Sequence, residues 1–170
     1  MAFILIDGYN LIGIAHKDLE KARSELIQNL SKYSELRGHH ITLVFDGWKS
    51  GQGMETNTRV KDVTIIYSRI GEKADTVIKR IISESRRSLI VVSSDREIAD
   101  FANRKDCVSL ASEEFNNKLH ACLHATGHEG SEESFIYDDG DAEATPALQK
   151  GNPWKPSKKI KKKLRALKKL

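Results

Sequence analysis

The sequence of 170 residues contains no hydrophobic run long enough to cross a membrane. A spanning helix needs about 20 apolar residues in succession, whereas the apolar stretches here have the length of a strand, as in residues 89–92. The first residues also lack the basic segment and extended apolar region of a signal peptide, because Asp7 follows only a short apolar run. These absences exclude a transmembrane protein and predict a cytoplasmic location with no membrane partner.

Cysteine is scarce, and glycine-rich phosphate-binding motifs are absent. Cys107 and Cys122 form no CxxC pair, so the sequence supports neither a disulfide framework nor a structural zinc site. Neither a P-loop nor a GxGxxG motif is present, which argues against a nucleotide-binding protein and a small-molecule cofactor. His120, His124 and His128 recur every four residues, and we interpret them as a solvated helix face, with a metal-binding stripe as the alternative.

The charges that are present lie in blocks. The formal net charge of +4 conceals seven acidic residues and no Lys or Arg in 129–149, followed by ten basic and no acidic residues in 150–170. We therefore divide the chain into a domain at 1–126, an acidic linker at 127–150 that we expect to be disordered, and a basic tail at 151–170.

Continuous apolar runs alternate with amphipathic segments along residues 1–125. The runs predict strands at 3–6, 41–45, 63–67, 89–92 and 107–110, and the three-and-four spacing predicts helices at 18–36, 73–82, 96–103 and 112–123. The polar stretch at 48–60 has no periodicity and is expected to be a loop. The order predicts an α/β fold, a three-layer sandwich with a mostly parallel central sheet.

Acidic residues follow three of the predicted strands. Asp7, Asp46 and Asp95 stand at strand ends, and Asp75 stands in the first turn of the helix at 73–82. Because the carboxyl ends of parallel strands share one edge of a sheet, we expect the four carboxylates to meet there.

Clustered carboxylates repel one another unless a cation neutralises them. The nearby donors, Asn10, Ser93 and Ser94, are hard oxygen ligands that favour Mg²⁺ or Mn²⁺ over zinc, and such sites cut phosphodiesters. The alternative is that each acid only caps a helix or forms a turn.

Four motifs, in this order and spacing, resemble those of the NYN domains of the PIN-like nuclease superfamily, closest to the bacterial YacP-like branch. They are Ile6-Asp7-Gly8-Tyr9-Asn10, Val44-Phe45-Asp46-Gly47, Lys73-Ala74-Asp75 and Val92-Ser93-Ser94-Asp95. The resemblance covers about residues 1–125. It implies a PIN-like fold and a metal-dependent ribonuclease whose relatives include a ribosome-associated enzyme.

The resemblance also implies roles for individual residues. Asp7, Asp75 and Asp95 would be the core metal ligands, and Asn10 and Asp46 would complete or orient the site. The segment from Ser93 to Asp95 is similar to the Ser/Thr-x-Asp turn of the superfamily, in which the hydroxyl helps to hold an acid or a phosphate.

Basic residues near these motifs are candidates for RNA contacts. Arg59, Lys61, Arg69 and Lys73 precede Asp75, and Arg96 follows Asp95. A solvated face explains the first four equally well. Trp48 and Lys49 follow Asp46; Trp48 is either a base-stacking residue or a structural one.

The basic tail places apolar residues at spacings of three and four on a cationic helix. We expect it to form on RNA or on the ribosome, with an anionic membrane as the less favoured surface. Its candidate RNA-binding residues are Lys158, Lys159, Lys161, Lys162, Lys163 and Arg165.

Two functions remain separate at this point. The first is a Mg²⁺- or Mn²⁺-dependent endoribonuclease that uses Asp7, Asp46, Asp75 and Asp95. The second is a non-catalytic RNA- or ribosome-binding module that relies on the basic tail.

Overall fold

The computed structural model describes residues 1–13, 18–47, 54–125 and 158–170. The expected linker, the end of the histidine series at His128, and Trp48 and Lys49 lie outside the described residues. The elements in chain order are β1 (Phe3–Asp7), α1 (Gly8–Ile12), α2 (Leu19–Arg37), β2 (His40–Phe45), β3 (Thr56–Val60), β4 (Val63–Tyr67), α3 (Ala74–Glu84), β5 (Leu89–Val92), α4 (Arg96–Arg104), β6 (Val108–Leu110), α5 (Ser112–Ala125) and α6 (Lys158–Lys169).

The strands form one sheet in the order β3-β4-β2-β1-β5-β6. Every neighbouring pair is parallel except β3 and β4, which form an antiparallel pair at one edge. The mostly parallel α/β sandwich is therefore confirmed. The chain leaves β1 toward β2 and later returns to β5 on its other side, so the carboxyl ends of β1 and β5 flank a topological switch point, where open α/β sheets bind ligands.

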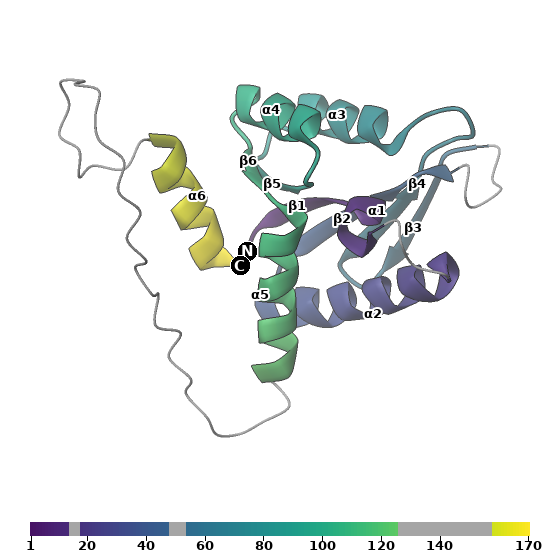
Figure 1. Cartoon of the computed structure of the whole chain (residues 1–170), viewed down its shortest axis with the longest axis horizontal. Coiled ribbons are helices and arrows are strands. Elements are labelled where there is room, and N and C mark those ends of the chain that lie inside the picture. The colour runs from purple at the N-terminus through teal and green to yellow at the C-terminus, as the bar shows by residue number, and fades with distance from the viewer. Residues whose placement is uncertain (14–17, 48–53, 126–157) are drawn as a thin grey trace, which may run out of the picture.

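Helices cover both faces of this sheet (Figure 1), as buried parallel strands require. One apolar core packs Ile4 and Ile6 of β1 with residues of α2 and α5, and a second packs Leu5 with residues of α3 and α4. Successive side chains of β1 thus enter opposite cores. None of the helices that the structure describes is long and apolar enough to span a membrane.

Local sequence explains most of the element boundaries. Asp18 caps α2 by accepting a hydrogen bond from Lys21 N at 3.0 Å, and Gly38 ends the helix with a φ of 62°. β3 could not be predicted from the sequence, because four of its five residues are polar, four are exposed, and they show no apolar alternation. The stretch expected to be a loop therefore contains an edge strand at 56–60.

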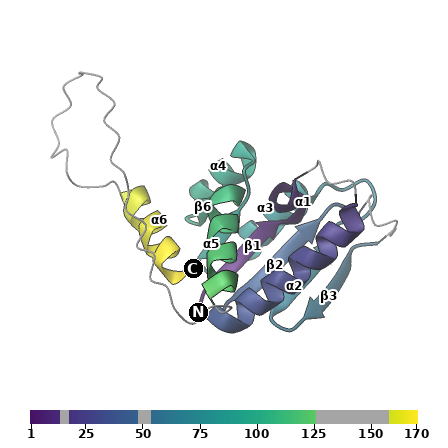
Figure 2. The same ribbon diagram turned by 60° about the horizontal axis from the view of Figure 1, so that its bottom comes forward.

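The basic helix α6 packs on the body of the domain (Figure 2). Ala166 and Leu170 are buried in the core shared with α2 and α5, and Tyr33 Oη donates a hydrogen bond of 2.7 Å to the carbonyl of Leu170. Lys163 pairs with Glu114 of α5 at 2.8 Å. Of the apolar stripe seen in the sequence, Leu167 and Leu170 thus contact the chain itself, whereas Leu164 is exposed.

Candidate active site

Asp7 ends β1 and begins α1 at the switch point of the sheet. Its Oδ1 accepts a hydrogen bond from Asn10 N at 3.1 Å, so the residue serves as an N-cap. Only 8% of the residue is exposed. Burial raises the pKa of Asp7 to about 6, opposed by the Asn10 hydrogen bond and reinforced by the charges of Asp75, Asp46 and Asp95.

Asp95 follows β5 and caps α4. Its Oδ1 accepts hydrogen bonds from Glu97 N at 2.6 Å and Ile98 N at 3.4 Å. The buried hydroxyl of Ser93 accepts a hydrogen bond of 3.1 Å from Asp95 N. The turn expected between Ser93 and Asp95 is therefore present, and its serine holds the backbone of the acid.

Asp75 and Asp46 meet at the beginning of α3. Asp75 is half-buried in the first turn, and Asp46, which follows β2, accepts a hydrogen bond of 2.6 Å from Ala74 N. Burial raises the pKa of Asp75, and the charges of Asp95 and Asp46 raise it further against the opposing effects of Lys79 and Lys73. The four acids thus lie within electrostatic reach of one another at one edge of the sheet.

The sequence allowed two interpretations of these acids, a cation-binding cluster or separate helix caps, and each describes part of this geometry. Asp7, Asp46 and Asp95 each use Oδ1 to hold a backbone N–H at the start of a helix. Within the described ranges, no group of three or more His, Cys, Asp or Glu side chains is placed to hold a metal ion. The hard oxygen donors and their mutual repulsion suit Mg²⁺ or Mn²⁺ chemically, but the side chains do not form a closed three-ligand cage.

Asn10 connects three elements beside this cluster. Its Oδ1 accepts hydrogen bonds from Ser94 N and from Ser112 Oγ, both at 3.1 Å, and Ser94 Oγ accepts another of 3.1 Å from Ser112 N. These contacts tie α1 to the turn after β5 and to the start of α5. Sequence reasoning treated Ser112 only as the start of a helix and missed its contact with Asn10, 102 positions away.

Residues 4–168 match the YacP-like NYN domain family. The chain belongs to this family. The match extends past residue 125 and includes most of α6, and the family gives the chain a nuclease-type domain with an RNA-related function.

Solved structures support the same fold. Crystal structures of Rae1 (YacP) from Bacillus subtilis share 23% sequence identity as the W164L mutant and 24% without that mutation, with TM-scores of 0.61 and 0.59. Each covers 75% of this chain, and the matched part is 80% and 78% of the respective Rae1 chain. Among curated proteins no match was found.

The basic residues of this YacP-like NYN domain divide between the two ends of the sheet. Arg69 and Lys73 lie on the connection between β4 and α3, and Arg96 is the first residue of α4, so all three are at the same end of the sheet as the acids. Arg59 and Lys61 instead lie at the hairpin between β3 and β4, which is at the other end of the strands. Although Arg59 and Lys61 are near Asp75 in the sequence, they lie far from the acids along the strands, because the hairpin between β3 and β4 is at the opposite end of the sheet.

Several basic residues that were expected to bind RNA instead contact other residues of this chain. Arg59 pairs with Asp62 at 2.9 Å and Lys61 with Glu35 at 2.7 Å. On α6, Lys162 bonds to the carbonyl of Asp106, while Lys161 and Arg165 are exposed. The side chains of Lys158 and Lys159 lie outside those described. The rings of His120 and His124 stack at 6.1 Å between centroids on an exposed face of α5.

Proposed function

We propose that this YacP-like NYN domain is an endoribonuclease that cuts RNA phosphodiester bonds with Mg²⁺ or Mn²⁺. The observation that carries the proposal is the placement of Asp7, a buried carboxylate that also faces the charges of three other acids. A carboxylate in such surroundings is costly to ionise unless a cation compensates it. The resemblance noted in the sequence further suggests that the substrate is RNA in turnover, including mRNA on the ribosome.

Asp7, Asp75 and Asp95 are the residues that would hold the cation. Mg²⁺ commonly keeps several water ligands and contacts the protein through only one or two carboxylates, so at least one of these three acids would bind the ion through a water molecule. This agrees with the described residues, among which no group of three such side chains is placed to hold a metal ion. When bound, such an ion activates a water molecule and stabilises the leaving oxygen of a phosphodiester.

The surrounding residues would orient this site and the substrate. The hydrogen bonds of Asn10 to Ser94 and Ser112 fix the turn that carries Asp95. Lys73 and Arg96 are exposed next to Asp75 and Asp95 and would bind phosphates of the RNA backbone.

A cleavage assay on structured and unstructured RNA tests the proposal. We expect the wild-type chain to cleave with Mn²⁺ or Mg²⁺ and to stop with EDTA, and we expect Asp95→Asn to abolish cleavage, because asparagine keeps the cap of α4 but removes the charge. Asp18→Asn is the matched control, since Asp18 also caps a helix but is exposed just before α2, outside the acid cluster. Cleavage that persists in EDTA, or in the Asp95 variant, contradicts the proposal.

The second candidate is a non-catalytic RNA- or ribosome-binding module. The observation that favours it is the use of Asp7, Asp46 and Asp95 as caps. In that case Asp95→Asn leaves function intact, whereas replacing the exposed Lys161 and Arg165 of α6 by alanine weakens RNA binding. Removing α6 entirely is a poor test, because Leu170 and Ala166 belong to the core.

A further inference from the structure

Helix α3 begins without a cap of its own. Lys73 occupies the N-cap position, where its side chain makes no capping hydrogen bond. The missing acceptor comes from Asp46, 28 positions before Ala74, whose Oδ1 lies 2.6 Å from Ala74 N. The next residue along the helix is Asp75. A side chain on the loop after β2 therefore fixes the turn that carries this acid.

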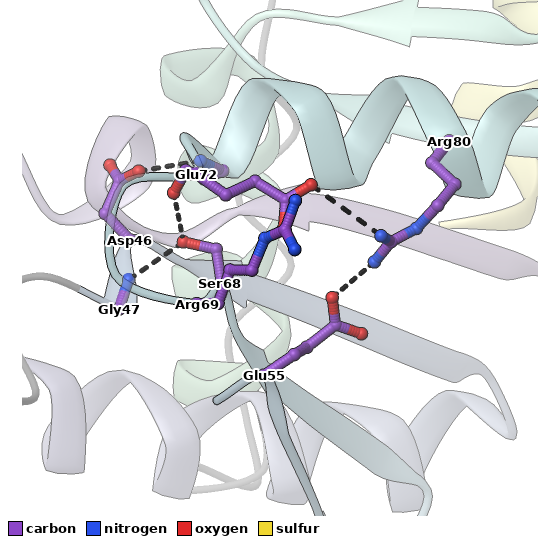
Figure 3. A network of polar contacts seen from close by, with 8 residues as sticks. Asp46, Gly47, Glu55, Ser68, Arg69, Glu72 and Arg80 are labelled. Atoms are coloured by element: carbon purple, nitrogen blue, oxygen red, sulfur yellow. Dashed lines mark hydrogen bonds and ion pairs between the residues drawn. The ribbon is translucent and has the colours of Figure 1, made fainter. Parts of the chain in front are cut away.

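The loop that holds Asp46 is joined to the same turn by Ser68 (Figure 3). Ser68 is fully buried; its Oγ accepts a hydrogen bond of 3.0 Å from Gly47 N and donates one of 2.6 Å to the carbonyl of Glu72. Its backbone N–H also donates to the carbonyl of Phe45 at 2.9 Å. A Cβ on residue 47 would lie 1.5 Å from the carbonyl oxygen of Ser68, so the close approach requires glycine.

Ion pairs hold the far side of the segment between β4 and α3. The carboxylate of Glu72, 10% exposed, lies 3.3 Å from Arg69 Nε and 3.7 Å from an Nη1 of Arg80 on α3, although Glu72 Oε2 accepts no hydrogen bond. Arg80 also pairs with Glu55, which precedes β3. The segment 68–73 is thus fastened both to the loop after β2 and to α3 itself.

We propose that Asp46 is a positioning residue, which sets the place of Asp75 by capping α3 while Ser68 holds the two loops together. Its contribution to cleavage rests on the proposed nuclease function, whereas its effect on the first turn of α3 does not. The required feature of residue 46 is then a hydrogen-bond acceptor and not a negative charge. Asparagine keeps that acceptor, and alanine removes it.

Three variants separate the two roles: Asp46→Asn, Asp46→Ala and Asp75→Asn. Amide hydrogen exchange at Ala74 and Thr76, followed by NMR on the full chain, reports the first turn of α3, because their N–H groups donate to Asp46 Oδ1 and to the carbonyl of Lys73. We expect Asp46→Asn to keep the protection of these amides and most of kcat. Asp46→Ala should lose the protection and lower kcat by about 100-fold with little change in KM, because misplacement by about 1 Å costs that much. Asp75→Asn should keep the protection and lose cleavage.

A serine pair extends the test. Ser68→Ala should raise exchange at the same amides. Ser31→Ala should leave them unchanged, because Ser31 is a buried serine of α2 whose Oγ donates to the carbonyl of Ile27 at 2.8 Å. The proposal is overturned if Asp46→Asn loses cleavage as completely as Asp75→Asn, or if Asp46→Ala keeps full amide protection. A wild-type chain that cleaves no RNA would refute the nuclease function alone, because the exchange data would still decide whether Asp46 positions the turn.

Discussion

Replacing Asp7 by asparagine is expected to stabilise the fold while removing a residue of the candidate site. Asparagine is as good an N-cap as aspartate, so the hydrogen bond from Asn10 N is retained. What disappears is a buried charge that faces Asp75, Asp46 and Asp95. A gain in stability at the expense of activity is the usual consequence of relieving repulsion at a functional site.

The magnitude follows from the pKa of this carboxyl. A rise from 3.8 to about 6 means that ionised Asp7 costs the folded chain about 3 kcal/mol. Because the folded pKa is the higher one, this cost is absent below pH 3.8, grows between pH 3.8 and about 6, and is constant above about 6. The free energy of unfolding of Asp7→Asn should therefore equal that of the wild type near pH 3.8 and exceed it by about 2–3 kcal/mol above about pH 6. For a chain of this size, that gain corresponds to a rise in Tm of roughly 5–10 °C.

Thermal unfolding followed by circular dichroism across this pH range, in EDTA so that no divalent cation compensates the acids, measures the difference. Asp18→Asn, the same substitution at an exposed cap outside the acid cluster, should change Tm little. A variant Asp7→Asn that is less stable than the wild type above pH 6, or whose gain in stability does not vary with pH, would refute this prediction.

Three further predictions concern other parts of the molecule. Gly47→Ala should destabilise the chain by about 2–4 kcal/mol in denaturant unfolding, because the added methyl meets the carbonyl of Ser68; an unchanged midpoint would contradict this. Tyr33→Phe should cost about 1 kcal/mol by the same assay, since it removes the hydrogen bond to the end of α6; an undiminished stability would count against that contact. Arg96→Ala should weaken RNA binding and lower the slope of log K against log salt by about one, whereas Lys61→Ala should leave the affinity and the slope unchanged. Equal effects of the two variants would contradict RNA binding at the end of the sheet that carries the acids.

The strand ends and the acids that follow them could be predicted because they depend on local features. An apolar run that stops at an aspartate marks both a buried strand and the edge at which parallel strands end, and Asp7 and Asp95 lie at that edge. The helix at 73–82 follows from the spacing of its apolar residues, so the position of Asp75 in its first turn was also predictable.

Contacts between distant segments could not be predicted in this way. The capping of α3 by Asp46 and the contact of Ser112 with Asn10 join parts of the chain that only the packing of loops brings together. The edge strand β3 was not predicted because a mostly polar, exposed strand shows no alternation of apolar residues. Its antiparallel pairing with β4, which separates Arg59 from the acids, was therefore not predicted either. Composition indicated a cationic helix at the C-terminus, but not that Leu167 and Leu170 of its apolar stripe would pack on the chain's own core.

Helix α6 covers one open edge of the sheet. β6 is the last strand of the sheet, and an open strand edge offers unpaired N–H and C=O groups to any other chain. Helix α6 lies against β6, and Lys162 reaches the carbonyl of Asp106 just before it. At the opposite edge, the exposed polar strand β3 and the charges of its hairpin discourage pairing instead. The two edge strands are thus protected from pairing with other chains in different ways: β6 is covered by α6, and β3 is polar and flanked by charges.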